Sequence, residues 1–122
     1  MNPTPPTRTF TDLQDLSLYL RHFARERDWE QYHSPKNLAA ALSVEAAELL
    51  EHFQWKTEKQ SNNLTQAEQQ EVAYEMADVL MYLTRMADCL GIDLLEAVAR
   101  KVALNQSKYP ALDKATPGPP GE

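Results

Sequence analysis

Apolar residues recur at helical spacing through four stretches of this chain, and no stretch shows the alternating pattern of a half-buried strand. Each stretch begins at a helix-capping signal, which strengthens the prediction of a helix. The predicted capping residues are Thr11, in a capping box with Gln14; Ser34, ahead of Pro35; Thr65, in a capping box with Glu68; and Asp93. Gly91 and Pro110 end the third and fourth helices, and the polar stretch 56–64 is predicted to be a loop.

These four helices predict an all-α fold, in which a four-helix bundle buries the apolar faces. A length of 122 residues suits one domain, which we place at residues 10–112. Residues 1–9 are expected to be a flexible Pro-rich segment, and residues 113–122 a disordered Pro/Gly tail. The third helix carries Leu80 and Met81 outside its main apolar stripe, so we expect a second subunit to cover part of it.

Composition excludes several classes of function. The chain has only three Gly, which leaves no glycine-rich phosphate loop, so phosphate chemistry must use side chains and metal. A net charge of −6 argues against nucleic acid as a partner, and no apolar run is long enough for a membrane span. The single Cys excludes a disulfide scaffold and a Cys-rich zinc site, and it fits a cytoplasmic protein.

Carboxylates fall on the apolar side of the second helix. Its apolar stripe contains Leu38, Leu42, Leu49 and Phe53. At about 100° per residue, Glu45 falls inside this stripe and Glu48 at its edge, whereas Glu51 points to solvent.

The third helix repeats this arrangement. Counted from Val72, Glu75 borders the apolar stripe, and Asp78 lies further round on an arc shared with Tyr82. Buried carboxylates are costly unless they are protonated, paired or metal-bound, and Arg85 lies far from the acidic arc. Glutamates three apart are also common on solvated helix faces. Two such pairs on packed helices could instead bring four carboxylates together, a ligand set that suits Mg²⁺ or Mn²⁺.

The two acidic pairs resemble a known family. Glu45-Ala-Ala-Glu48 and Glu75-Met-Ala-Asp78 match the E-x-x-E…E-x-x-D pattern of the MazG-like all-α nucleoside triphosphate pyrophosphohydrolases. The surrounding segments are similar to the dCTP pyrophosphatase branch: ERDWEQYH at 26–33, FQWKT at 53–57, DVLMYL at 78–83 and KYPA at 108–111. The resemblance covers about residues 10–112.

This resemblance implies a four-helix unit that assembles as a homo-oligomer, with a tetramer favoured over a dimer. The implied reaction is Mg²⁺-dependent hydrolysis of a (d)NTP, of dCTP or modified dCTP in this branch, to the monophosphate and pyrophosphate. It would serve to clean the nucleotide pool. By position, Glu45, Glu48, Glu75 and Asp78 would be the metal ligands, and Glu48 is the candidate for positioning the attacking water.

The resemblance also implies a set of substrate-binding residues. Trp29 and Trp55 would line the base pocket, with Tyr82 beside the sugar or base. The full set is Trp29, His33, Asn37, Trp55, Tyr82, Lys101, Asn105 and Tyr109, of which the last three would lie near the phosphates.

Three alternatives stay open at this point. A related pyrophosphohydrolase could act on dUTP or on a broad range of (d)NTPs. A carboxylate-bridged di-iron bundle needs two E-x-x-H motifs, and only Glu30 to His33 fits one. A non-enzymatic helical interaction protein predicts that Glu45 and Glu75 face solvent.

Overall fold

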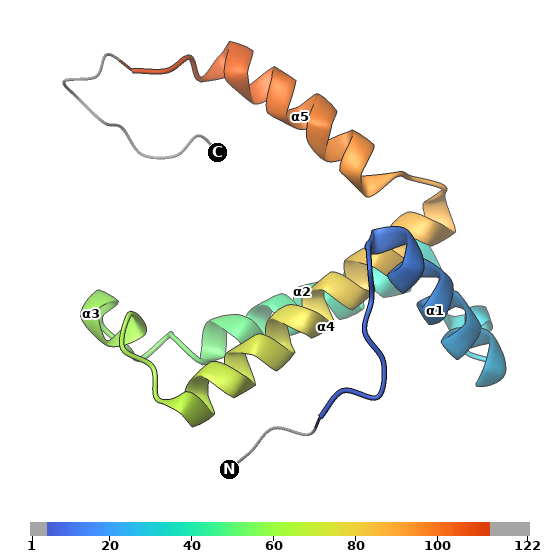
Figure 1. The fold of residues 1–122 in the computed structure, drawn as a ribbon, viewed down its shortest axis with the longest axis horizontal. Coiled ribbons are helices and arrows are strands. Elements are labelled where there is room, and N and C mark those ends of the chain that lie inside the picture. The colour runs from blue at the N-terminus through green and yellow to red at the C-terminus, as the bar shows by residue number, and fades with distance from the viewer. Residues whose placement is uncertain (1–4, 113–122) are drawn as a thin grey trace. The chain divides into compact units, whose positions relative to one another are not determined.

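The computed structural model of the protein describes residues 5–112, and all regular structure within that range is helical (Figure 1). Its elements are α1 (Leu13–Glu26), the 3-10 turn η1 (Glu30–Tyr32), α2 (Pro35–Glu51), α3 (Glu58–Ser61), α4 (Gln66–Leu90) and α5 (Leu94–Lys108). The all-α prediction is therefore confirmed. The expected tail at 113–122, and residues 1–4 of the expected N-terminal segment, lie outside the described residues.

The chain divides into two compact units between Gly91 and Ile92. The first unit holds α1 to α4, and the second holds α5. A four-helix bundle within a single domain over residues 10–112 stays a prediction, because each unit is described by itself.

Three of the four predicted capping residues are confirmed. Ser34 accepts a hydrogen bond from the backbone N–H three residues on, at 3.1 Å. Thr65 forms its capping box with Glu68, and Asp93 caps α5. Gly91 ends α4 with a φ of 68°, a left-handed conformation that glycine adopts without a steric penalty.

The predicted cap of the first helix is wrong by one residue. Asp12, not Thr11, caps α1, and its Oδ1 accepts the backbone N–H of Asp15 at 2.8 Å. Thr11 instead donates its own N–H to the Asp15 carboxylate at 3.2 Å, so it does not form the expected box with Gln14. Two adjacent residues could each cap this helix, and the aspartate is the stronger capping residue of the two.

The stretch predicted as a loop contains the short helix α3. Thr57 and Gln60 form a capping box that starts it, a signal that the polar composition of residues 56–64 concealed. Phe53, placed on the face of the second helix from sequence, lies beyond its end at Glu51. It sits instead in the turns that lead to α3.

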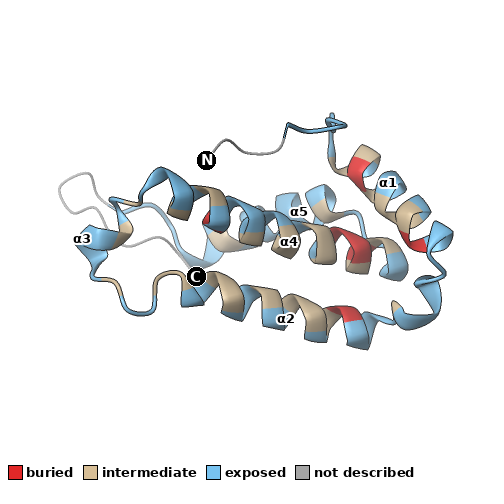
Figure 2. Cartoon of the chain, turned by 90° about the horizontal axis from the view of Figure 1, so that it is seen from below, coloured by how far each residue is buried: buried red, intermediate tan, exposed pale blue. Residues whose placement is uncertain are grey.

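Within the first unit, α2 and α1 both pack on α4, and α2 lies alongside α4 in Figures 1 and 2. The buried apolar side chains lie on these three helices: Leu16, Ala24, Leu38, Val72 and Ala87 (red in Figure 2). This small core fixes α2 against α4, and that helix pair carries both acidic motifs.

Much of the apolar stripe expected to be buried on α4 is exposed. Val72 is buried, but Met76 is 57% exposed, and Leu83 and Leu90 on the same stripe are also exposed. On α2, Leu50 is exposed as well. Among the described residues, no helix combines the length and the apolar character needed to cross a membrane.

Candidate functional site

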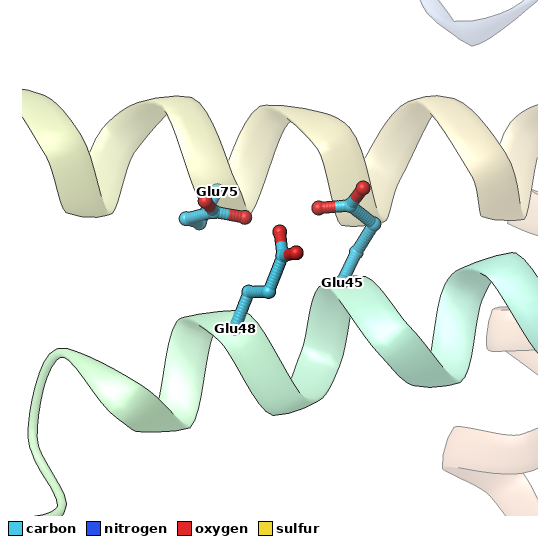
Figure 3. Close-up of side chains that lie close together, drawn as sticks. All are labelled: Glu45, Glu48 and Glu75. Atoms are coloured by element: carbon cyan, nitrogen blue, oxygen red, sulfur yellow. The ribbon is translucent and has the colours of Figure 1, made fainter.

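Three carboxylates meet between α2 and α4, and we call Glu45, Glu48 and Glu75 the acidic cluster. One oxygen of each lies within 4.8 Å of one oxygen of each of the others. Figure 3 shows Glu45 and Glu48 rising from adjacent turns of α2 toward Glu75 on α4. The spacing of three residues puts the two α2 carboxylates on one face, and the helix packing supplies the third.

Contacts at the two ends of the helix pair set its register. His33, just before α2, contacts Arg85 near the end of α4, and Lys56, after α2, pairs with Glu68 at the start of α4. The two helices are therefore antiparallel. The acidic cluster lies between these two contacts, which hold the helices close on either side of it.

The acidic cluster lacks cationic partners within the described residues. No ion pair there includes a member of the cluster or Asp78. The Oε2 atoms of Glu45 and Glu75 are enclosed and accept no hydrogen bond from a described residue. An enclosed carboxylate oxygen without a donor is unfavourable, so these two atoms indicate a ligand, either a proton or a cation.

Burial raises the pKa of Glu45 to about 7, with further contributions from Glu48, Glu75 and the charge of Asp78. Asp78 is half-buried one turn beyond Glu75 and is not one of the three clustered carboxylates. Its charge nevertheless acts on Glu45, so all four predicted acids contribute to one negative field. Near neutral pH the cluster takes up a proton unless a cation neutralises it.

The donor set fits a hard divalent cation. All the candidate ligands are carboxylate oxygens, and no described His or Cys joins the group. Mg²⁺ and Mn²⁺ prefer such oxygen ligands, whereas softer metals favour nitrogen or sulfur. The enclosed, unpartnered oxygens of Glu45 and Glu75 are the positions such an ion would satisfy.

At one end of the helix pair lie an aromatic ring and an imidazole. The rings of Trp29 and His33 are 6.3 Å apart between centroids, and Phe23 braces Trp29 edge-on at 5.5 Å. The side chain of Asn37 is already engaged in a local hydrogen bond, in which its Nδ2 donates to the carbonyl of Tyr32 at 3.0 Å. The structure thus brings Trp29 and His33 together, whereas Asn37 holds the turn that carries them.

Trp55 lies beyond the opposite end of α2 and is 88% exposed. It borders a cavity of about 710 Å³, which is also lined by His52, Lys56 and Glu68. Between Trp29 and Trp55 stands the whole of α2, with 17 residues and a length of about 25 Å. Within one chain, the two tryptophans do not line a common pocket.

The remaining predicted site residues are divided between the two units. Tyr82 is half-buried on α4, two turns beyond Glu75. Lys101 and Asn105 lie one turn apart on α5, and the N–H of Tyr109 donates to the carbonyl of Asn105 at 2.7 Å. These α5 residues belong to the second unit, which is described separately from the acidic cluster.

Sequence reasoning missed one polar network. Arg85 was set aside as remote from the acids, yet its side chain is buried beside His33. Arg85 follows Asp78 by seven residues, two helical turns, so the pattern already placed it further along the same side of α4. Its partner His33 is 52 residues away, a pairing that local periodicity does not detect.

Comparisons with known proteins show which proteins this chain is similar to. Residues 40–116 match the model of the MazG-like family, a span that contains both acidic motifs. The chain is 42% identical over 101 residues to human dCTP pyrophosphatase 1 and 40% identical over 100 residues to the mouse protein of that name. These matches cover 81% and 80% of this chain and 59% of each relative, so the chain spans under two thirds of their length.

A solved structure is also similar. A pyrophosphatase from Archaeoglobus fulgidus matches with a TM-score of 0.78 and 40% sequence identity. The match covers 88% of this chain and all of that one. The shared fold and sequence therefore extend over most of the chain.

The raised pKa of Glu45 predicts a pH-dependent stability. Its folded-state pKa, about 7, lies above the ordinary value of 4.5, so the folded protein retains a proton that the unfolded chain releases. This stabilisation is complete below about pH 4.5 and is lost as the pH rises through about 7. The Tm of the metal-free protein should therefore fall between pH 5 and pH 8, and Glu45→Gln should reduce that fall by several degrees.

The matched control is Glu51→Gln, which removes an exposed carboxylate from the same helix and should keep the wild-type dependence. Thermal unfolding in EDTA, followed by circular dichroism, measures both. An unchanged pH dependence in Glu45→Gln would contradict the assignment.

Proposed function

The chain belongs to the MazG-like family, and from this membership and the acidic cluster we propose that it hydrolyses deoxynucleoside triphosphates to the monophosphate and pyrophosphate. The reaction requires Mg²⁺, which Mn²⁺ can replace. The observation that carries the proposal is that Glu45 and Glu75, whose carboxylates meet between α2 and α4, each have an enclosed oxygen without a hydrogen-bond partner. The relatives are named for dCTP, which favours dCTP or a modified dCTP as substrate and nucleotide-pool cleaning in the cytoplasm as the role.

In this proposal the acidic cluster and Asp78 hold the metal. A bound divalent cation would neutralise charge on the triphosphate and lower the barrier to attack by water. Glu48 is the member of the cluster without an enclosed, unpartnered oxygen, so one of its oxygens can contact the metal while the other orients the water and accepts its proton. No nucleophilic side chain and no covalent intermediate is required.

The nucleoside would extend along α4 from the acidic cluster toward His33. Along α4, the helix rises about 10 Å from Asp78 to Arg85, the residue that contacts His33. Such a distance is comparable to the separation of the phosphates and the base in an extended nucleotide. Tyr82 lies between these points, and Trp29 offers an aromatic surface on which a base can stack.

A complete base pocket would need two copies of the chain. Trp29 and Trp55 lie beyond opposite ends of α2, so they can meet only when a second copy brings its Trp55 to the first copy's Trp29. A two-fold axis between two copies would place the Trp55 end of one α2 near the Trp29 end of the other. The exposed Met76 and Leu80 on α4 support a homo-oligomer, for which we favour a tetramer over a dimer.

The second unit carries three further candidates for substrate binding. Lys101, Asn105 and Tyr109 are assigned to the phosphates, because a lysine charge and amide and phenol donors suit phosphate oxygens. They lie within the stretch that matches the family model.

Specific contacts weaken two of the alternatives. Glu30 pairs with Arg25, and the Nδ1 of His33 accepts from Arg85, so neither residue of the E-x-x-H motif resembles a free di-iron ligand. An interaction protein predicts solvent-facing glutamates, whereas Glu45 and Glu75 are half-buried and face each other. Action on dUTP differs from our proposal only in the base, and action on a broad range of (d)NTPs differs in the base and the sugar.

The reaction is tested by pyrophosphate release from a panel of dNTPs and NTPs that includes 5-methyl-dCTP. We expect release in Mg²⁺, none in EDTA, and the highest kcat/KM for cytosine deoxynucleotides. Glu48→Gln should lower kcat by about 10²-fold or more, because it removes the proposed base. Glu51→Gln, one turn away on the solvent side, should stay near wild type. A folded wild-type protein that releases no pyrophosphate from any triphosphate would contradict the proposal.

The two-copy pocket is tested by complementation. Trp29→Ala and Trp55→Ala should each lower kcat/KM for dCTP by at least about tenfold, because each removes a stacking surface. When the two variants are refolded together, mixed oligomers contain pockets with both tryptophans, so activity should return. Full activity of either variant alone, or a mixture no more active than its parents, would contradict the arrangement.

A further inference from the structure

A buried arginine joins three separate segments of the first unit. The side chain of Arg85 on α4 is only 9% exposed, and its Nε donates to Nδ1 of His33 at 3.1 Å. Its Nη1 donates to Asp88 at 2.8 Å, and Asp88 also accepts from Nε of Arg21 on α1 at 3.0 Å. The network fixes the guanidinium of Arg85 in one orientation against the imidazole.

This contact determines where His33 carries its proton. A guanidinium only donates hydrogen bonds, so the Nδ1 that faces Arg85 must be the unprotonated nitrogen. Burial, followed by the charge of Arg85, lowers the pKa of His33, and the charge of Glu30 opposes this only in part. The ring is therefore neutral at pH 7, and its single proton lies on Nε2.

The imidazole is also fixed in position. The Sγ of Cys89 lies 3.5 Å from the carbonyl of His33 as a weak donor, and Trp29 flanks the ring. No described residue accepts a hydrogen bond from Nε2 of His33, although the ring is only half-buried. A fixed donor beside an aromatic face is thus left available to a ligand.

The bases of nucleotides differ in what they present to such a donor. Cytosine carries acceptors at both N3 and O2, whereas uracil and thymine carry a donor, N3–H, at the first of these positions. A donor that cannot change tautomer and that is directed at N3 donates a hydrogen bond to cytosine, whereas in uracil it meets N3–H, a second donor. Two facing donors leave both groups unpaired, which is the strongest form of polar discrimination.

We propose that Arg85 is a positioning residue that holds His33 as an Nε2–H donor, and that this donor selects cytosine over uracil for the base stacked on Trp29. The inference rests on the proposed triphosphate hydrolysis and adds a determinant of its base preference. Arg85 itself touches no substrate.

Arg85→Met tests this role, and Arg21→Met is the matched control. Each variant removes one of the two arginines from Asp88, but only the first removes the contact with His33. In Arg85→Met we expect the ratio of kcat/KM for dCTP to that for dUTP to fall about tenfold, the effect of one hydrogen bond. Arg21→Met should keep this ratio within about twofold even if its Tm falls equally.

The ¹⁵N shifts of His33 give a second reading that does not depend on activity. The wild type and Arg21→Met should show an unprotonated Nδ1 and a protonated Nε2, whereas Arg85→Met should show both tautomers in exchange. If Arg85→Met does not fold, Arg85→Gln replaces it. The glutamine amide carries both a donor and an acceptor, so it does not force Nδ1 of His33 to be the unprotonated nitrogen, and the same changes are expected.

An unchanged ratio and an unchanged tautomer in the folded Arg85 variant would overturn the inference, as would an equal fall of the ratio in Arg21→Met. Failure of the proposed function is distinguishable, because the wild type would then hydrolyse no triphosphate. In that case base selection is rejected, while the ¹⁵N shifts still decide whether Arg85 fixes the tautomer.

Discussion

The carboxylates between α2 and α4 are the constraint on which the rest of the first unit depends. Glu45 and Glu75 bring negative charge into a helix interface, and among the described residues no side-chain cation pairs with either of them. Such an interface closes stably only when a proton or a metal ion neutralises part of the charge. The raised pKa of Glu45 reflects this, because burial and its acidic neighbours both favour the protonated form.

The surrounding structure holds the acids together despite their repulsion. α2 packs on α4 with Leu38 and Val72 buried, and the Arg85–His33 and Lys56–Glu68 contacts join the two ends of the pair. The acidic cluster between these contacts therefore does not have to hold the two helices together. The polar contacts at the two ends also present different chemistry, with a fixed imidazole beside Trp29 at one and an exposed indole beside a cavity at the other.

Local signals could be predicted from the sequence. The caps at Ser34, Thr65 and Asp93 depend on residues a few positions away, and the inward direction of Glu45 and Glu75 follows from helical periodicity. The short helix α3 escaped prediction because four polar residues show no apolar stripe. The cap of α1 was misplaced because two neighbouring residues compete for it.

Contacts between distant segments could not be predicted in the same way. Arg85 meets His33 only after α2 has packed antiparallel to α4. Trp29 and Trp55 both carry the family resemblance, yet they lie beyond opposite ends of α2. A family resemblance can suggest that two residues serve one pocket, but it does not say whether one chain brings them together.

Diffraction from crystals grown with Mn²⁺, measured at the manganese absorption edge, tests the central claim most directly. We predict an anomalous peak bounded by Glu45, Glu48, Glu75 and Asp78, with at least one metal contact from an oxygen that is unpartnered here. A fully loaded crystal with no peak between α2 and α4, or with manganese bound only elsewhere, would contradict the account.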